Sequence, residues 1–462
     1  MIDSISKLVL FIALISPGYL SAQNLADKWY TKVEVDREQQ HYLFDIRAEE
    51  NGLGGLIDDL SNANFRLPLD SVSINNANQV YIRHNGLNIV FEGTINPSGT
   101  RIEGMLQVGD SEIEALLSRR PQARRTQLIN EAANYTSEEI HFTNQDGTRF
   151  SGTLSLPEGE EACPAVVLIS GSGPQDRNSE ILGHQPFAVL ADHLASRGVA
   201  VLRYDDRGYG RSEGQFRPAT SMDYADDAHG AVNFLKTYAG REFSHIGLLG
   251  HSEGGNIAPV VANQDSAISF MVLLAAPGVP NYEHYLTSLD LIMREHPETY
   301  DRDFPFFALV YRDMAFIKNP VRLKQTLTQR FTGITSQMTQ EELAPYGGKE
   351  SYIESQVSHH SSEWYRHYLQ FDVTPYLAKL SIPVLALNGN LDTSVESSQN
   401  LTGIEQTLKR AGNNDVTVVE LENVNHFFQV STDDKIESVY FNEVTFSEEA
   451  LQIISDWMKE FE

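Results

Sequence analysis

The sequence predicts an α/β protein in which a mostly parallel sheet flanked by helices follows a small all-β domain. Beyond residue 135, apolar stretches such as 164–170 (PAVVLIS) and 199–205 (VAVLRYD) alternate with amphipathic helical stretches. Strands that are apolar throughout need helices on both faces of their sheet, which is typical of parallel strands. Residues 25–125 differ, because their apolar and polar residues alternate in short runs broken by Asn, Gly and Ser, as in antiparallel strands.

The N-terminal β-rich domain is predicted for residues 23–130. Its strand-like runs are HYLFDIRA (41–48), QVYIRH (79–84), LNIVFEGTI (87–95) and TRIEGMLQV (100–108). The arginine-rich run SRRPQARRTQ (118–127) follows them and surrounds a proline. It predicts a solvated linker, and a basic binding patch is the alternative interpretation.

The second domain is predicted for residues 136–462 and begins with a hairpin over 139–156, whose turn is Asn-Gln-Asp-Gly. Strands are expected at 245–250 (HIGLLG), 270–277 (FMVLLAAP), 382–389 (IPVLALNG) and 416–423 (VTVVELEN). Residues 279–380 interrupt this alternation with helical periodicity and many aromatic residues. Such an insertion predicts a helical cap over the site.

Composition narrows the classes of partner. The chain has 462 residues and a net charge of -28, which argues against nucleic acid or an anionic membrane surface as a partner. A single cysteine, Cys163, excludes an intrachain disulfide and is expected to be a small buried hydrophobe. Residues 1–22 have the layout of a cleavable signal peptide, which predicts export to the periplasm or the extracellular space. No later segment is apolar enough to predict an integral membrane span.

Two serines fit the G-x-S-x-G pattern of a serine nucleophile: Ser252 in GHSEG and Ser212 in GRSEG. A nucleophile elbow needs a strand before the serine and a helix after it, with glycines where no side chain fits. Ser252 has the strand-like HIGLL before it and an apolar helix-like segment after it. Ser212 lies in a charged, glycine-rich loop and is followed by Pro218, so it is expected to be structural.

A serine hydroxyl needs a neighbouring base and a group that orients the base. On this fold the acid follows the next-to-last strand and the histidine follows the last strand. Asp392 and His426 occupy these two places, and no other histidine comes after Asp392. Glu396 and Glu422 are the rival acids.

Acyl transfer also needs donors for the developing oxyanion. The backbone N–H of Glu253, which follows the serine, is one expected donor. The other is expected from the loop 170–176 (SGSGPQD), with the N–H of Ser172 first and that of Gly173 second. A phosphate-binding role for these glycines is the weaker alternative, because the loop lacks the full spacing of a phosphate-binding motif.

The ordered motifs LISGSGPQDRN, RYDDRGYGRSEG, GHSEGG, ALNGNLDTSV and ENVNHF resemble the α/β-hydrolase superfamily. The chain is most similar to secreted bacterial serine hydrolases of the esterase or prolyl-oligopeptidase-like kind, over residues 136–462. This resemblance implies an α/β-hydrolase fold with a helical cap, a triad of Ser252, His426 and Asp392, and no metal or organic cofactor. One departure is Ser170-Gly171 where many esterases have His-Gly.

The favoured function is therefore hydrolysis of a carboxylic ester, with a small-molecule or glycan-linked ester as substrate. A serine peptidase or amidase on the same triad is the main alternative. A thioesterase and an inactive, hydrolase-like binding protein are less favoured. The sequence leaves the acyl group, the alcohol, the oligomeric state and the task of the β domain open.

Overall fold

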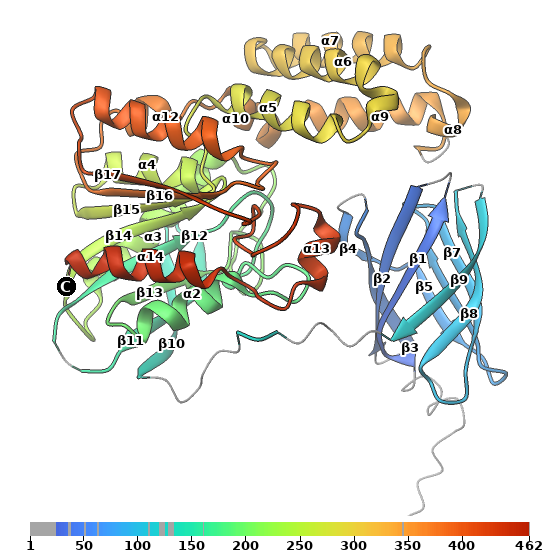
Figure 1. Ribbon diagram of the computed structural model, residues 1–462, viewed down its shortest axis with the longest axis horizontal. Helices are drawn as coiled ribbons and strands as arrows, with labels where there is room; N and C mark the ends of the chain where they lie inside the picture. The colour runs from blue at the N-terminus through green and yellow to red at the C-terminus, as the bar shows by residue number, and fades with distance from the viewer. Residues whose placement is uncertain are drawn as a thin grey trace, which may run out of the picture. The chain divides into compact units, whose positions relative to one another are not determined.

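A computed structural model describes residues 25–461 except 36–37, 50–51, 62–63, 110, 120–124, 128–133, 160 and 344–345. The chain folds into two compact units (Figure 1). The first comprises Met1–Pro121 and Gln340–Pro345, and the second Gln122–Thr339 and Tyr346–Glu462. The predicted signal peptide at 1–22 lies outside the described residues.

The first unit contains a nine-stranded sheet, which confirms the predicted all-β domain. Its strands pair antiparallel in the order β4-β3-β2-β1-β9-β8-β7-β6-β5. Their bounds are β1 Asp27–Val35, β2 Glu38–Glu49, β3 Gly52–Asp59, β4 Asn64–Pro68, β5 Ser71–Ile74, β6 Gln79–His84, β7 Ile89–Ile95, β8 Arg101–Val108 and β9 Ser111–Arg119. Trp29, Phe44 and Phe91 are fully buried at the centre of its core.

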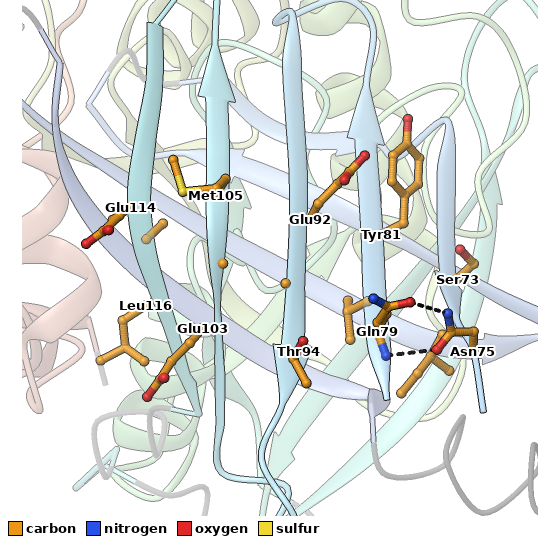
Figure 2. Close-up of a pocket in the computed structure, with 15 residues that line it drawn as sticks. Ser73, Asn75, Gln79, Tyr81, Glu92, Thr94, Glu103, Met105, Glu114 and Leu116 are labelled. Carbon is orange, nitrogen blue, oxygen red and sulfur yellow. Dashed lines mark hydrogen bonds between the residues drawn. The ribbon is translucent and has the colours of Figure 1, made fainter. Parts of the chain in front are cut away.

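One face of this sheet carries an open groove of about 1060 Å³ (Figure 2). The residues that line it include Gly93 and Gly104, which pair directly with each other on β7 and β8. A Cβ on Gly104 would lie 2.0 Å from the carbonyl oxygen of Glu92, so only glycine allows the two strands to approach this closely. Side chains such as Tyr81 and Glu103 stand along the groove.

The second unit contains an eight-stranded mixed sheet in the order β10-β11-β13-β12-β14-β15-β16-β17. The strands are β10 Tyr135–Thr143, β11 Arg149–Pro157, β12 Cys163–Ile169, β13 Ala200–Tyr204, β14 Phe243–His251, β15 Ile268–Leu274, β16 Val384–Gly389 and β17 Val416–Leu421. Strands β10 and β11 pair antiparallel to each other and β11 pairs antiparallel to β13, whereas the pairs from β13 to β17 are parallel. The predicted mostly parallel sheet is therefore confirmed.

Helices cover both faces of this sheet, as fully apolar strands require. Helices α2 (Pro186–Ala195) and α14 (Glu448–Met458) pack on one face (Figure 1). Helices α3 (Ser221–Thr237), α4 (Gly254–Gln264) and α12 (Ser397–Arg410) pack on the other. The short α13 (Ile436–Phe441) and η2 (Lys459–Phe461) complete the C-terminal part of the unit.

The helical insertion lies between β15 and β16, inside the predicted range 279–380. It consists of α5 Asn281–Met293, α6 Pro297–Phe316, α7 Pro320–Ile334, α8 Gln340–Leu343, α9 Lys349–His360, α10 Glu363–Gln370 and α11 Thr374–Leu377. Tyr285, Tyr311, Tyr365 and Tyr368 form an aromatic cluster between α5, α6 and α10. We call the second unit's part of this insertion the cap.

The arginine-rich run 118–127 does not behave as a wholly solvated linker. The Arg125 guanidinium donates to the carbonyl oxygens of Leu182, Tyr440 and Asn442. The prediction was therefore wrong for Arg125, because a guanidinium has five donors and satisfies several chain carbonyls at once. This part of the run is attached to the second unit.

Two further expectations concern burial. Cys163 is buried at the start of β12, and burial raises the pKa of its thiol, which matches a small hydrophobe. In the described part of the chain, the helices are all too short or too polar to cross a bilayer.

Candidate active site

Ser252 lies at a sharp turn between β14 and α4. Its φ is 54°, in the left-handed region that residues other than glycine rarely adopt. A Cβ on Gly250 would lie 2.2 Å from the carbonyl oxygen of Gly254, and a Cβ on Gly254 would lie 2.3 Å from that of Ile169. The glycines of the motif are thus required by close backbone contacts, and the turn exposes the serine hydroxyl at the carboxyl end of the sheet.

The structure brings Ser252, His426 and Asp392 into one hydrogen-bonded row. His426 Nε2 lies 3.2 Å from Ser252 Oγ, and His426 Nδ1 lies 2.8 Å from Asp392 Oδ2. Because a carboxylate only accepts, Nδ1 carries the proton and Nε2 is free to accept one from the serine. The second oxygen of Asp392 accepts the backbone N–H groups of Ser394 and Val395, which orients the carboxylate.

The environment of His426 sets its proton affinity. Burial by itself lowers the pKa of the imidazole, because it penalises the charged form. The nearby carboxylates of Asp392 and Asp434 act in the opposite direction and prevail, so the pKa lies above the ordinary 6.5. The imidazole is therefore a stronger base than a free histidine and is stabilised once it takes a proton.

Asp434 forms hydrogen bonds with both the loop that contains Asp392 and the loop that contains His426. Its Oδ1 accepts the backbone N–H of His426 at 2.9 Å, and its Oδ2 accepts the N–H and the hydroxyl of Thr393 at 2.9 and 2.8 Å. We did not single out Asp434 from the sequence. Its only signal was a second acidic residue shortly after the histidine, in the loop between β17 and α13.

His251 directly precedes Ser252 and forms a hydrogen bond with the loop that contains His426. Its Nε2 lies 2.9 Å from the carbonyl oxygen of His426 and so donates to it. Burial and the neighbouring His426 lower the pKa of His251 to about 3, which keeps it neutral. His251 therefore acts as a fixed neutral donor beside the site.

The predicted oxyanion loop lies against the nucleophile. A Cβ on Gly171 would lie 3.1 Å from the Cβ of Ser252, so this position has little room for a side chain. The buried carboxylate of Asp206 holds both ends of the loop, accepting from Ser170 Oγ at 2.7 Å and from Gln175 N at 2.8 Å. Burial raises the pKa of Asp206 to about 8. The hydrogen bonds of Asp206 thus connect it to the oxyanion loop.

Glu253 has a second set of contacts that the sequence did not reveal. Its side chain is 1% exposed, and its carboxylate accepts from Ser172 Oγ and Ser221 Oγ at 2.7 and 2.5 Å. The indole N–H of Trp364 in α10 also donates to it, at 3.2 and 3.3 Å. Burial raises the pKa of Glu253. A charged residue at the start of an apolar helix was the signal available in GHSEGG.

The rival residues make other contacts. Ser212 is buried, donates to the carbonyl oxygen of Asp205 at 2.7 Å and accepts from Ser151 N at 3.0 Å. Glu396 caps α12 by accepting from Ser398 N and Gln399 N. Glu422 accepts from the side-chain amide of Asn390. The hydroxyl of Ser212 is therefore engaged by two backbone groups. The carboxylates of Glu396 and Glu422 are engaged by groups other than His426.

Metal binding requires several convergent ligands. Within the described ranges, no group of three or more His, Cys, Asp or Glu side chains is arranged to hold a metal ion.

Several known proteins are similar to parts of this chain. Esterase EstD of Thermotoga maritima is 30% identical over 201 residues, which cover 40% of this chain and 48% of that protein. Thiohydrolase aneE of Aspergillus aculeatus is 33% identical over 144 residues, covering 31% of this chain and 42% of that protein. The chain thus spans about half the length of these curated relatives. The crystal structure of hypothetical protein PA2218 from Pseudomonas aeruginosa aligns with 74% of this chain and 100% of its own, at 16% identity and a TM-score of 0.45.

A model of the family described as serine aminopeptidase, S33, matches residues 184–432. This match covers more than half of the chain and contains Ser252, Asp392 and His426. Together with the sheet order and the strand-turn-helix at Ser252, it identifies the chain as a member of the serine aminopeptidase S33 family of the α/β-hydrolase superfamily.

Proposed function

We propose that this protein hydrolyses carboxylic esters through an acyl-enzyme on Ser252. The observation that carries the proposal is the row of hydrogen bonds from Asp392 through His426 to Ser252, at a strained turn beside a loop that approaches the nucleophile. The same constellation of nucleophile, base and orienting acid activates serine on several unrelated folds.

In the first half of the reaction, Ser252 Oγ attacks the acyl carbon while its proton moves to His426 Nε2. The carbonyl oxygen becomes an oxyanion, for which we propose the backbone N–H groups of Glu253 and Ser172 as donors, with Gly173 as the alternative to Ser172. Collapse of the tetrahedral intermediate breaks the bond to the alcohol oxygen. The His426 imidazolium gives its proton to that oxygen, and the alcohol leaves.

In the second half, water takes the place of the alcohol. His426 removes a proton from the water, the hydroxide attacks the acyl carbon, and the oxyanion forms in the same place. Collapse then releases the carboxylic acid and returns the proton to Ser252. Asp392 stabilises the imidazolium in both halves.

An ester substrate is supported by the relative named esterase EstD. We propose a small-molecule or glycan-linked ester. Purified protein should hydrolyse short-chain p-nitrophenyl esters, and Ser252→Ala should reduce turnover to the background rate. Loss of ester turnover only in Ser212→Ala would contradict the proposal.

The family description favours a serine aminopeptidase as the second candidate. The triad would serve both reactions, because the attacked group is an acyl carbon in each. Comparing kcat/KM for an aminoacyl p-nitroanilide with that for the p-nitrophenyl ester of the same acyl group discriminates them. A higher value for the anilide favours the aminopeptidase. A thioester of that acyl group tests the thioesterase alternative, which the name of thiohydrolase aneE supports.

We also propose that the protein is exported to the periplasm or beyond. The support is the order of a lysine, an apolar run and small residues within positions 1–22. Cell fractionation with N-terminal sequencing of the mature chain tests it. An intact N-terminus in a cytoplasmic fraction would contradict it.

A further inference from the structure

Three elements of the second unit meet at the carboxylate of Glu253. Ser172 belongs to the oxyanion loop, Ser221 begins α3, and Trp364 belongs to helix α10 of the cap. Glu253 itself follows the nucleophile, and its backbone N–H is a proposed oxyanion donor. One side chain therefore joins the turn of the nucleophile to the oxyanion loop and to the cap.

The chemistry of this junction is unusual for a purely structural contact. Burying a carboxylate away from water is costly, and apolar side chains of the same volume often stabilise a fold at least as well. Here Ser172 and Ser221 donate hydroxyl hydrogens, and the indole of Trp364 can only donate. The site is thus built around an acceptor.

Trp364 connects the junction to the interior of the cap. Its ring stacks on Tyr365, with centroids 5.7 Å apart, and packs against Tyr368 at 5.3 Å. Both tyrosines belong to the aromatic cluster with Tyr285. A shift of α10 would therefore move the indole N–H relative to Glu253.

We infer that Glu253 is a positioning residue for the oxyanion loop, which it fixes through its hydrogen bond with Ser172. Because Glu253 also accepts a hydrogen bond from Trp364, the position of the loop depends on the position of the cap. This inference rests on the proposed function and adds a determinant of its rate.

The physical consequence is specific to the transition state. Loosening the loop misplaces a donor that acts only when the oxyanion forms, so kcat falls while KM changes little. Ser172→Ala removes the hydroxyl and leaves the backbone N–H of residue 172 in the chain. Trp364→Phe keeps an aromatic ring in the cap and removes only the indole N–H with part of the ring.

The test is a double-mutant cycle with a p-nitrophenyl ester. Ser172→Ala and Trp364→Phe should each lower kcat about 10-fold with KM within about threefold. Because both act through Glu253, the double variant should lose about 10-fold rather than the roughly 100-fold expected of independent effects. Trp457→Phe on α14, a partly buried tryptophan packed against Phe461, is the matched control and should keep the wild-type kcat.

Variants of Glu253 test whether the effects of Ser172→Ala and Trp364→Phe both act through its side chain. In Glu253→Ala, neither Ser172→Ala nor Trp364→Phe should lower kcat further, because the junction is already absent. Glu253→Gln should recover part of the loss, since its carbonyl oxygen can still accept from Trp364 and from one serine hydroxyl, while the other serine hydroxyl rotates to accept from its amide. Thermal melting and titration of Ser252 with a fluorophosphonate establish the fraction of folded, competent sites for every variant.

The outcomes separate the two proposals. A wild-type protein that neither hydrolyses the ester nor reacts with the fluorophosphonate contradicts the proposed function. A fully active wild type in which the two losses multiply, or in which kcat is unchanged in both single variants, overturns the role of Glu253 alone.

Discussion

The carboxylate of Asp434 accepts the backbone N–H of His426 at 2.9 Å and thereby holds the histidine on the side of the acid loop. Its other oxygen accepts the N–H and the hydroxyl of Thr393, the residue that follows Asp392. One partly buried carboxylate thus connects the loops that follow β16 and β17. The alignment of Asp392 with His426 depends on this connection.

Asp434→Asn tests the connection. The amide keeps the shape but offers one acceptor oxygen, so one of the two backbone N–H groups loses its partner. The free energy of unfolding should fall by about 1–3 kcal/mol, the usual cost of an unsatisfied buried group. The charge that helps to raise the pKa of His426 is also removed, so the acid limb of kcat/KM should move to lower pH. An unchanged stability and an unchanged limb would together refute this role.

The raised pKa of His426 predicts the pH dependence of the wild type. His426 accepts a proton only when neutral, so kcat/KM should rise with pH through its pKa, with a midpoint above 6.5. Asp392→Asn removes the principal raising interaction and leaves burial, which lowers the pKa. The midpoint of the rise in kcat/KM should therefore lie at a lower pH than in the wild type, and kcat should fall by about 10⁴-fold. A midpoint that is the same in both proteins would mean that another group limits the rate at low pH.

Asp206 predicts a pH dependence of stability. Its pKa is about 8 in the folded protein and near 3.8 when exposed. Between these values the unfolded chain has lost the proton and the folded chain keeps it, so stability falls as the pH rises, by on the order of 6 kcal/mol at most.

Asp206→Asn should remove that part of the decline, as urea unfolding at pH 5 and pH 8 would show. Asp456→Asn, at an exposed carboxylate on α14, is the control and should decline like the wild type. Equal declines in wild type and Asp206→Asn would mean that Asp206 is ionised in the folded protein.

Ser212→Ala should affect stability rather than rate. Its hydroxyl is buried and bridges Asp205 O and Ser151 N, so its removal leaves buried groups without a partner and should cost about 1–3 kcal/mol. At a temperature where the variant is folded, kcat should stay within about threefold of the wild type. The exposed Ser98→Ala is the matched control for stability and should change it by less than about 0.5 kcal/mol.

The sequence predicts the architecture best where one physical rule governs many residues. Apolar strands alternating with amphipathic helices predict the second unit, and the order of strands leads to Asp392 and His426, whose catalytic roles stay a prediction. Strand β3 was not predicted, because its run GLGGLIDD is rich in glycine, which weakens strand propensity. In the structure the close pairing of β3 with β2 requires glycine, since a Cβ on Gly55 would lie 2.5 Å from Asp45 O.

The supporting residues of the site could not be predicted in the same way. Glu253 and Ser172 are 81 positions apart, and Asp434 and Thr393 are 41 positions apart. Their contacts depend on how loops at the ends of different strands fold against each other, and a single sequence carries no periodic signal for such loops. Arg125 escaped prediction for the same reason, since its acceptors are carbonyl oxygens of Leu182 and of residues more than 300 positions away.

Covalent labelling decides whether Ser252 is the nucleophile. The protein is reacted with a fluorophosphonate, digested, and the modified peptide is identified by mass spectrometry. We expect one adduct, on Ser252, which is absent in Ser252→Ala and much slower to form in His426→Ala. An adduct on another serine, or labelling of Ser252→Ala at the wild-type rate, would contradict it.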